Sequence, residues 1–446
     1  MINTQDRQTL IVGLGKSGLS CARYLHDKRA SLRVIDTRQQ PPGLQTLQQE
    51  MPDVSVHTGD FDSDWFAQAD ELVVSPGVAI SQPAISDAMT HGTPVLGDIE
   101  LFAHAANAPV VAITGTNGKS TVTMLLAEMA AKAQRHYKVG GNLGTPALDL
   151  LGDDSTDIYI LELSSFQLET TQSLNAVAAV VLNVAPDHMD RYDDMQDYAN
   201  TKQRIYAGNG VMVINKDDAY ASAMHDASRT SIYFTLSSPN ESEYGLHNDN
   251  GVQWFAKGND RLFSENDIKL RGRHNYANIL AALALAEAAG LPQQAAIQAC
   301  REFAGLAHRC QWLTQLHGVN FYNDSKATNV AATVATLRGL NTKSVLIAGG
   351  QSKESDYAPL VDAVRDCCEA VVLIGRDAKL IAAALANTVP VHFADDMHNA
   401  VNEAYTIASD NAADVVLAPA CASFDMFENF EHRGDVFSEA VRGLQP

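Results

Sequence analysis

The chain has little positive charge for its size. Among its 446 residues, 53 Asp and Glu outnumber 32 Lys and Arg, which gives a formal net charge of −21. Proteins that bind nucleic acid need many basic contacts to phosphate, so this balance argues against that class of partner. It still permits small anionic substrates wherever the scarce Lys and Arg residues gather in a cleft.

Long apolar runs and closely spaced cysteines are also missing. No run approaches the roughly 20 residues that span a bilayer, and the first residues, MINTQDRQ, lack the pattern of a secretion signal. The six cysteines are scattered without metal-ligand spacing, as is typical of reduced thiols. We therefore expect a soluble cytoplasmic protein with no membrane insertion.

Strand-like and helix-like segments alternate along most of the chain, and this alternation predicts parallel sheets. Residues 236–272 interrupt it with polar turns around short alternating runs, so we expect a small antiparallel ribbon there. At this length the chain suits two or three domains. We predict an α/β fold of three domains in series, covering residues 1–98, 99–305 and 306–446.

The first motif is Gly13-x-Gly15-x-x-Gly18, which follows a strand, opens a helix and is followed by Asp36 at the end of the next strand. Such glycines let the backbone approach a diphosphate at a helix N-terminus, while the acid takes a ribose hydroxyl. Lys16 adds positive charge beside it. The motif predicts a Rossmann-like domain that binds a nucleotide diphosphate, although a glycine-rich turn without a ligand remains possible.

A second and sharper motif, TGTNGKST, occupies residues 114–121 between a strand and a helix. In phosphate loops the backbone N–H groups cradle phosphates, a lysine such as Lys119 reaches the terminal ones, and a hydroxyl such as that of Ser120 ligates Mg²⁺. The strict pattern would have glycine at the position of Ile113, so this loop is a variant. It predicts a central ATPase-type domain.

Acidic, histidine and lysine side chains follow the later strands of this central unit. Glu162 ends an apolar strand, where a second Mg²⁺ ligand is expected, but it could also be an ordinary surface carboxylate. His188 lies beyond another strand end, where a lone histidine is more often structural. On pattern alone, Lys202 in the helical stretch DYANTKQRIY is a solvated lysine.

Polar turns also follow the strands of the third unit. They include His308-Arg309, the segment NDSKATN (323–329), GGQSKESD (349–356) and Ser423-Phe424. Each alone could be loop chemistry. Several such turns at the carboxyl ends of strands in one sheet indicate a ligand crevice in a second Rossmann-like domain.

Taken together, these blocks resemble the Mur ligase family over essentially the whole chain. The resemblance rests on TGTNGKST, GGNLG, LELSSFQL, NVAPDHMDRY, YANTKQRIY, GRHN, AHR, NDSKATN, GGQSKESD and ASFDMFENFEHRG, which occur in this order. NDSKATN matters most for the choice within the family. The resemblance implies an ATP-dependent ligase that adds D-glutamate to UDP-N-acetylmuramoyl-L-alanine. The reaction would proceed through an acyl phosphate, in cytoplasmic synthesis of peptidoglycan precursors.

The resemblance also assigns residues to sites. The UDP-linked substrate is expected at Leu14, Gly15, Lys16, Ser17, Asp36, Thr37, Arg38, Ser75, Pro76, Gly77 and Asn142. ATP is expected at Gly115, Thr116, Asn117, Gly118, Lys119, Ser120, Thr121, Asn275, Arg309 and Asp324. D-glutamate is expected at Thr328, Lys353, Ser423, Phe424 and Phe430.

For catalysis the resemblance implies Lys119, His188, Lys202 and Lys326. It implies two Mg²⁺ ions held by Ser120, Glu162, His188 and Lys202, the last as a CO₂-derived carbamate. The expected partners are the three small substrates, with no nucleic acid, and the expected oligomeric state is a monomer with a mobile C-terminal domain.

Three other interpretations stay open at this point. An oxidoreductase would use the first glycine motif as a dinucleotide site, but it would leave TGTNGKST and NDSKATN unexplained. A non-catalytic nucleotide switch would keep TGTNGKST without needing Glu162, His188 and Lys202. A sister ligase would add a different amino acid.

Overall fold

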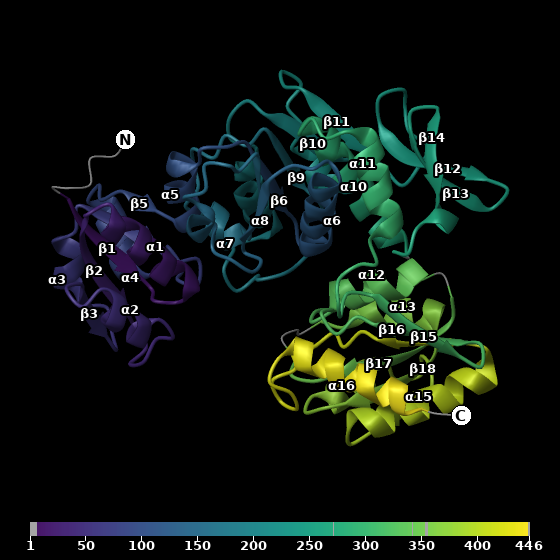
Figure 1. Cartoon of the computed structure of the whole chain (residues 1–446). Coiled ribbons are helices and arrows are strands. Elements are labelled where there is room, and N and C mark those ends of the chain that lie inside the picture. Colours follow the sequence, from purple (N-terminus) through teal and green to yellow (C-terminus); the bar gives the residue numbers. More distant parts are fainter. Residues whose placement is uncertain (1–6, 271, 341, 353–355, 445–446) are drawn as a thin grey trace.

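A computed structural model describes residues 7–270, 272–340, 342–352 and 356–444 of the chain. Its helices and strands form three sheet-centred bodies that follow one another along the sequence, of five, nine and six strands (Figure 1). The predicted fold class, three α/β domains in series, is confirmed.

The first sheet is parallel throughout and has the strand order β3-β2-β1-β4-β5. Its strands are β1 (Gln8–Val12), β2 (Ser31–Asp36), β3 (Ser55–Thr58), β4 (Glu71–Val74) and β5 (Val95–Leu96). Its helices are α1 (Lys16–Asp27), α2 (Leu44–Glu50), α3 (Ser63–Ala67) and α4 (Pro83–Thr90). The order reverses between β1 and β4, so a crevice forms beyond the carboxyl ends of these two strands.

The central sheet has the order β14-β13-β12-β11-β10-β9-β6-β8-β7. Its parallel strands are β6 (Val110–Thr114), β7 (Tyr137–Gly141), β8 (Ile158–Glu162), β9 (Ala178–Val181), β10 (Val211–Asn215) and β11 (Ser231–Phe234). Within segment 236–272, β12 (Tyr244–Asp249), β13 (Val252–Lys257) and β14 (Asp260–Ser264) pair antiparallel with one another. This ribbon continues the main sheet, because Tyr244 of β12 pairs with Phe234 of β11.

Helices cover both faces of the central sheet. They are α5 (Asp98–Ala105), α6 (Lys119–Lys132), α7 (Ser165–Leu168), α8 (Met195–Gln203), α9 (Ala219–Ala223), α10 (Arg273–Ala288) and α11 (Gln293–Glu302). On one face α6, α10 and α11 share an apolar core with the strands. The core of the other face runs without a break into the first domain, where it includes Ile11 and Leu14. The first two domains are therefore joined by buried apolar surface.

The third sheet has the order β15-β16-β20-β17-β18-β19. Its strands are β15 (Gln311–Leu316), β16 (Val319–Asn323), β17 (Ser344–Gly349), β18 (Cys368–Ile374), β19 (Val391–Phe393) and β20 (Asp414–Leu417). Helices α12 (Val330–Leu340), α13 (Ala358–Cys367) and α14 (Ala378–Ala384) pack on one face. Helices α15 (Met397–Asn411) and α16 (Phe430–Gly443) pack on the other. Strands β16 and β20 are parallel neighbours, so the loops after them lie at one edge.

Within the described residues, no helix is both long and apolar enough to cross a membrane.

Candidate active site

The glycine turn after β1 packs tightly against the turn after β4. Ser75 Oγ donates a 2.7 Å hydrogen bond to the Gly13 carbonyl. A Cβ on Gly18 would lie 1.9 Å from that same carbonyl oxygen, so only glycine fits at this position. The predicted substrate turns 14–17 and 75–77 are thus brought together in the crevice between β1 and β4.

Asp36 ties this turn to the end of β2. Its carboxylate accepts hydrogen bonds from the Leu14 N–H at 2.7 Å and from the Arg38 guanidinium at 2.6 and 2.9 Å. Burial acts to raise the pKa of Asp36, but the hydrogen bonds from Arg38 and Leu14 outweigh it and leave the pKa lowered. Asp36 is therefore charged and structural as well as adjacent to the predicted nucleotide.

The phosphate loop between β6 and α6 is held by the next strand over. The Asn117 N–H donates to Asn183 Oδ1 at 2.8 Å, Asn183 Nδ2 donates to the Asn117 carbonyl at 3.0 Å, and the Thr116 N–H donates to the Asn183 carbonyl at 3.0 Å. Gly118 has a left-handed φ of +87° at the N-terminus of α6. The loop is preorganised to present N–H groups and a helix N-terminus to phosphate.

Ser120 joins residues from three parts of the chain. Its hydroxyl donates to Glu162 Oε2 at 2.6 Å and accepts from Arg309 Nη2 at 2.7 Å. Glu162 Oε1 accepts from Asn142 Nδ2 at 2.7 Å. Asn142, predicted to contact the UDP-linked substrate, thus lies in the central domain beside Glu162. Arg309 brings the C-terminal domain onto the phosphate loop.

The prediction from pattern alone that Lys202 is solvated is wrong. Its side chain on α8 is only 1% exposed, and its Nζ donates to the Gly115 carbonyl at 3.2 Å. Burial, and then the charge of Lys119, hold the pKa of Lys202 well below its usual range, while Asp187 opposes the shift. Because α8 has few apolar residues, its sequence does not predict that the face carrying Lys202 packs under the phosphate loop.

His188 lies on the loop after β9 in a left-handed conformation with φ +56°. Its ring centroid is 4.8 Å from that of Phe166. Among the residues that the structure describes, no group of three or more His, Cys, Asp and Glu side chains is placed to share a metal ion. The metal sites implied by the resemblance therefore need ligands of other types, such as hydroxyl groups, beside these side chains.

The donor atoms around Ser120 fit one Mg²⁺ ion, since a hydroxyl and a carboxylate are hard oxygen ligands. A second ion near His188 does not fit an unmodified Lys202, because an ammonium group has no lone pair to donate and a neutral amine is not the oxygen ligand that Mg²⁺ prefers. A carbamate on the same nitrogen would supply two oxygens. The fit of the second ion thus depends on that modification.

Two residues of α10 lie behind the loop. Asn275 is buried, and its Oδ1 accepts from Asn278 Nδ2 at 3.2 Å. A Cβ on Gly118 would lie 2.3 Å from Asn278 Oδ1, which places that amide directly against the loop. Asn275, predicted to contact ATP, is therefore linked to the phosphate loop through Asn278.

The loop after β16 holds Asp324, predicted to contact ATP, and Lys326, predicted to be catalytic. Asp324 is buried and accepts from the Cys310 N–H at 3.1 Å and from the Thr336 hydroxyl. Burial raises its pKa to about 6. Lys326 Nζ lies 3.8 Å from the centre of the Phe430 ring, and burial, with the charge of Arg309, lowers its pKa to about 8.

Four of the residues predicted to bind D-glutamate lie on the segments that follow β16 and β20. Thr328 follows β16, Ser423 and Phe424 follow β20, and Phe430 begins α16. The Ser325 hydroxyl donates to the Phe430 carbonyl at 2.8 Å, so these loops are joined. Phe424 is 68% exposed. Lys353 lies outside the described residues.

The sequence interpretation missed Asn183, Tyr198 and Arg191. Asn183 bonds the phosphate loop, and the Tyr198 hydroxyl lies 3.4 Å from Thr116 Oγ1 and its ring 4.5 Å from Lys202 Nζ. Arg191 joins the central domain to the turn after β4 in the first domain. All three lie in the blocks NVAPDHMDRY and YANTKQRIY, where only the histidine and the lysine were singled out.

Comparison with known families matches three models in succession along the chain. They are the Mur ligase MurD-like N-terminal domain at residues 7–97, the Mur ligase middle domain at 113–286 and the Mur ligase glutamate ligase domain at 308–421. Two relatives are named UDP-N-acetylmuramoylalanine–D-glutamate ligase. The one from Nitrosococcus oceani is 52% identical over 98% of this chain and 96% of its own length. The one from Marinobacter nauticus is 49% identical over 98% and 99%.

Solved structures with the same fold include the UDP-N-acetylmuramate-alanine ligase of Thermotoga maritima. It has a TM-score of 0.59 at 16% identity and covers 98% of this chain and 100% of its own. The folylpolyglutamate synthase of Mycobacterium tuberculosis, complexed with ADP, has a TM-score of 0.58 at 15% identity and covers 81% and 98%. These two likenesses concern the fold alone.

Proposed function

Since the chain belongs to the Mur ligase family, we propose that it is the ATP-dependent ligase that adds D-glutamate to UDP-N-acetylmuramoyl-L-alanine, giving ADP and phosphate. The observation that supports this most directly is the meeting of domains at Ser120. This hydroxyl of the phosphate loop bonds Glu162 of the central domain and Arg309 of the glutamate ligase domain. A site shared in this way suits a reaction with three substrates.

The chemical obstacle is the approach of a carboxylate to a triphosphate. Two like charges at about 4 Å repel by roughly 4 kcal/mol at an effective dielectric constant of about 20. In our proposal Lys119 and the loop N–H groups hold the phosphates, so the substrate carboxylate can attack the terminal phosphorus and form an acyl phosphate with ADP leaving. The deprotonated amine of D-glutamate then attacks the acyl carbon, and phosphate leaves.

Two Mg²⁺ ions would supply the remaining charge neutralisation, one held by Ser120 and Glu162 and one by His188 and the Lys202 carbamate. The burial of Lys202 and the lowering of its pKa favour the carbamate, because only a neutral amine captures CO₂. Lys326 would support the phosphates from the C-terminal domain. The UDP-linked substrate would occupy the turns 14–17, 36–38 and 75–77, with Asn142 contacting its far end.

For the amino acid we propose a pocket of Thr328, Ser423, Phe424 and Phe430, with Lys353 pairing with the side-chain carboxylate of D-glutamate. Lys353→Ala should raise the KM for D-glutamate far more than that for ATP, and equal effects would refute this assignment. We further propose domain limits of 1–98, 99–305 and 306–446, a monomeric state and a cytoplasmic location.

Phosphate release by the purified protein tests the function. With Mg-ATP and UDP-N-acetylmuramoyl-L-alanine, we expect release that depends on D-glutamate and is not supported by L-alanine, L-lysine or meso-diaminopimelate. Release with one of those amino acids would identify a sister ligase instead. ATP binding without amino-acid-dependent release would identify a nucleotide switch, and binding of NAD(P)H would favour an oxidoreductase.

A further inference from the structure

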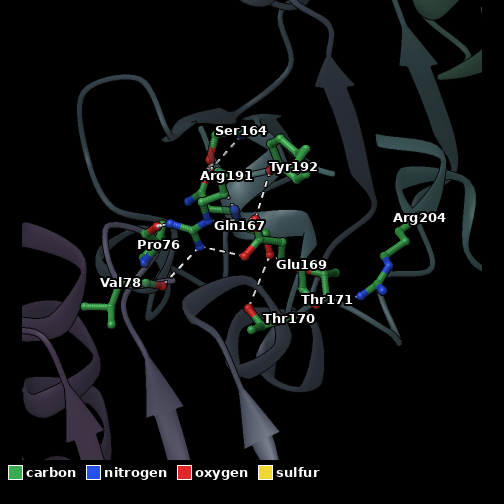
Figure 2. Close-up of polar contacts among 10 residues, drawn as sticks. All are labelled: Pro76, Val78, Ser164, Gln167, Glu169, Thr170, Thr171, Arg191, Tyr192 and Arg204. Atoms are coloured by element: carbon green, nitrogen blue, oxygen red, sulfur yellow. Dashed lines mark hydrogen bonds and ion pairs between the residues drawn. The ribbon is translucent and has the colours of Figure 1, made fainter. Parts of the chain in front are cut away.

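Arg191 forms a polar bridge between the central domain and the first domain. Its Nη1 donates to the Pro76 carbonyl at 3.1 Å and its Nη2 to the Val78 carbonyl at 3.0 Å, both in the turn after β4. The same guanidinium donates to Glu169 of the central domain at 2.9 and 2.6 Å. Figure 2 shows the Arg191 side chain between this turn and Glu169.

The surroundings of Glu169 fix this bridge firmly. Glu169 also accepts from the Tyr192 hydroxyl at 2.9 Å, and the Arg191 guanidinium lies 4.3 Å from the centre of the Phe166 ring. The side chains of Arg191 and Glu169 are only 12% and 8% exposed. A bidentate pair has strong hydrogen bonds, and removing one partner of a pair shielded from water leaves a buried charge without its counter-ion. Only arginine has enough planar donors for a carboxylate and two carbonyls at once.

The bridge sets the orientation of a peptide in the predicted substrate turn. Because the peptide unit is planar and trans, the Gly77 N–H points opposite to the Pro76 carbonyl, and so away from Arg191. This turn is also held to the glycine motif, since Ser75 Oγ donates to the Gly13 carbonyl. Arg191 thus acts on the backbone of the turn from behind its predicted binding side.

Arg191 also contacts His188, which lies on the same loop. The Arg191 N–H donates to the His188 carbonyl at 3.0 Å, and the Phe166 ring contacts both the guanidinium and the imidazole. One residue therefore fixes the distance between the turn after β4 and the part of the central domain that faces the phosphate loop.

We propose that Arg191 is a positioning residue that holds the Pro76–Val78 turn in register with the central domain, so that a bound UDP-linked acceptor delivers its carboxylate to the phosphate loop. This inference rests on the proposed function for the identity of the acceptor. Arg191 contacts no reacting atom in this scheme and acts through the backbone of the turn.

Calorimetric binding of UDP-N-acetylmuramoyl-L-alanine and, separately, of ATP to the full chain tests the proposal. Arg191→Lys keeps the charge but cannot reproduce four hydrogen bonds. We expect a Kd for the UDP-linked substrate raised about tenfold, with that for ATP changed by less than about twofold. In steady-state assays the KM for the same substrate should rise and kcat should fall, because the acceptor is held out of register.

Arg23→Lys is the matched control. Arg23 makes a bidentate pair with Glu50 at 2.6 and 2.8 Å in the first domain, away from the turn. Its loss should leave both Kd values unchanged. Equal weakening of both ligands by Arg191→Lys, or no change in either, would overturn the proposal.

Glu169→Gln provides a second variant, which keeps the shape of the side chain but removes its charge. It should raise the Kd for the UDP-linked substrate about threefold. Circular dichroism reports whether each variant folds. If neither variant folds, the pair is only part of the scaffold and the proposal is wrong. If the unaltered protein binds the UDP-linked substrate but releases no phosphate with D-glutamate, the proposed function fails, while the binding comparison still decides the role of Arg191.

Discussion

Lys119 and Lys202 donate to the same acceptor, the carbonyl oxygen of Gly115, at 2.9 and 3.2 Å. Two ammonium groups on one carbonyl repel each other, and both lysines have lowered pKa values, with burial as the main cause. In the proposed function, Lys119 gains phosphate as a counter-ion. Lys202 is fully buried under the loop, so conversion to an anionic carbamate would turn this repulsion into attraction.

The first prediction follows from this pair. Incubation with ¹³C-bicarbonate should give one carbamate carbon resonance in the unaltered protein and none in Lys202→Ala. The same substitution should lower turnover by about 100-fold, as loss of a metal-supporting group does. Lys216→Ala is the control, because Lys216 is a partly exposed lysine paired with Glu243. Wild-type turnover in Lys202→Ala would show that the carbamate is not required.

The second prediction concerns the backbone at Gly118. Gly118→Ala adds a methyl group both at a left-handed φ and 2.3 Å from Asn278 Oδ1. Gly92→Ala is a matched control, since Gly92 has a φ of +90° and no atom within 4 Å of its Cβ position. Both variants should lose about 1 kcal/mol of stability from backbone strain.

Only Gly118→Ala should also raise the KM for ATP, by about tenfold or more, because Asn278 and the loop must separate. Removing the amide in a Gly118→Ala, Asn278→Ala double variant should recover part of that loss. Absence of any recovery would show that backbone strain alone, and not the contact with Asn278, controls the loop.

The third prediction uses the raised pKa of Asp324, about 6 in the folded chain against an ordinary value of 3.8. Between these values the folded state keeps a proton that the unfolded state has lost. The contribution of Asp324 to stability therefore falls as the pH rises from about 4 to about 6, by at most about 3 kcal/mol, and is then constant. Asp324→Asn should lack this slope in urea denaturation series.

Asp362→Asn serves as the control for that series, because Asp362 is exposed and pairs only with Arg365 among its described contacts. It should keep the slope of the unaltered protein. If Asp324→Asn follows the same slope, the carboxyl group is ionised in the folded state throughout this range.

The parts of the site that are local in sequence could be predicted from it. Gly13 and Gly118 have left-handed φ angles of +93° and +87°, and a Cβ on Gly18 would lie 1.9 Å from the carbonyl oxygen of Gly13 in the same turn. The parts that depend on packing could not. The sequence around Lys202 is typical of a solvated lysine, but in the fold α8 places its Nζ against the Gly115 carbonyl. The position of Asp36 suggests a ribose ligand, but its carboxylate accepts hydrogen bonds from Leu14 and Arg38. Arg191 is one charged residue among several until two domains are placed on either side of it.

The last prediction concerns the pH dependence of ATP use. Lys326 has a pKa of about 8, lowered by burial and by Arg309, so its charge is present below pH 8 and lost above it. If Lys326 supports the phosphates, kcat/KM for ATP should fall above a pH of about 8, since this ratio reports ionisations of the free protein. Lys326→Arg keeps a charge at all these pH values and should shift the falling limb to higher pH, even where its absolute rate is lower. Lys379→Arg, a change at an outer position of α14, should leave the limb in place. A limb that stays at pH 8 in Lys326→Arg would assign it to another group and remove the main reason to place Lys326 at the phosphates.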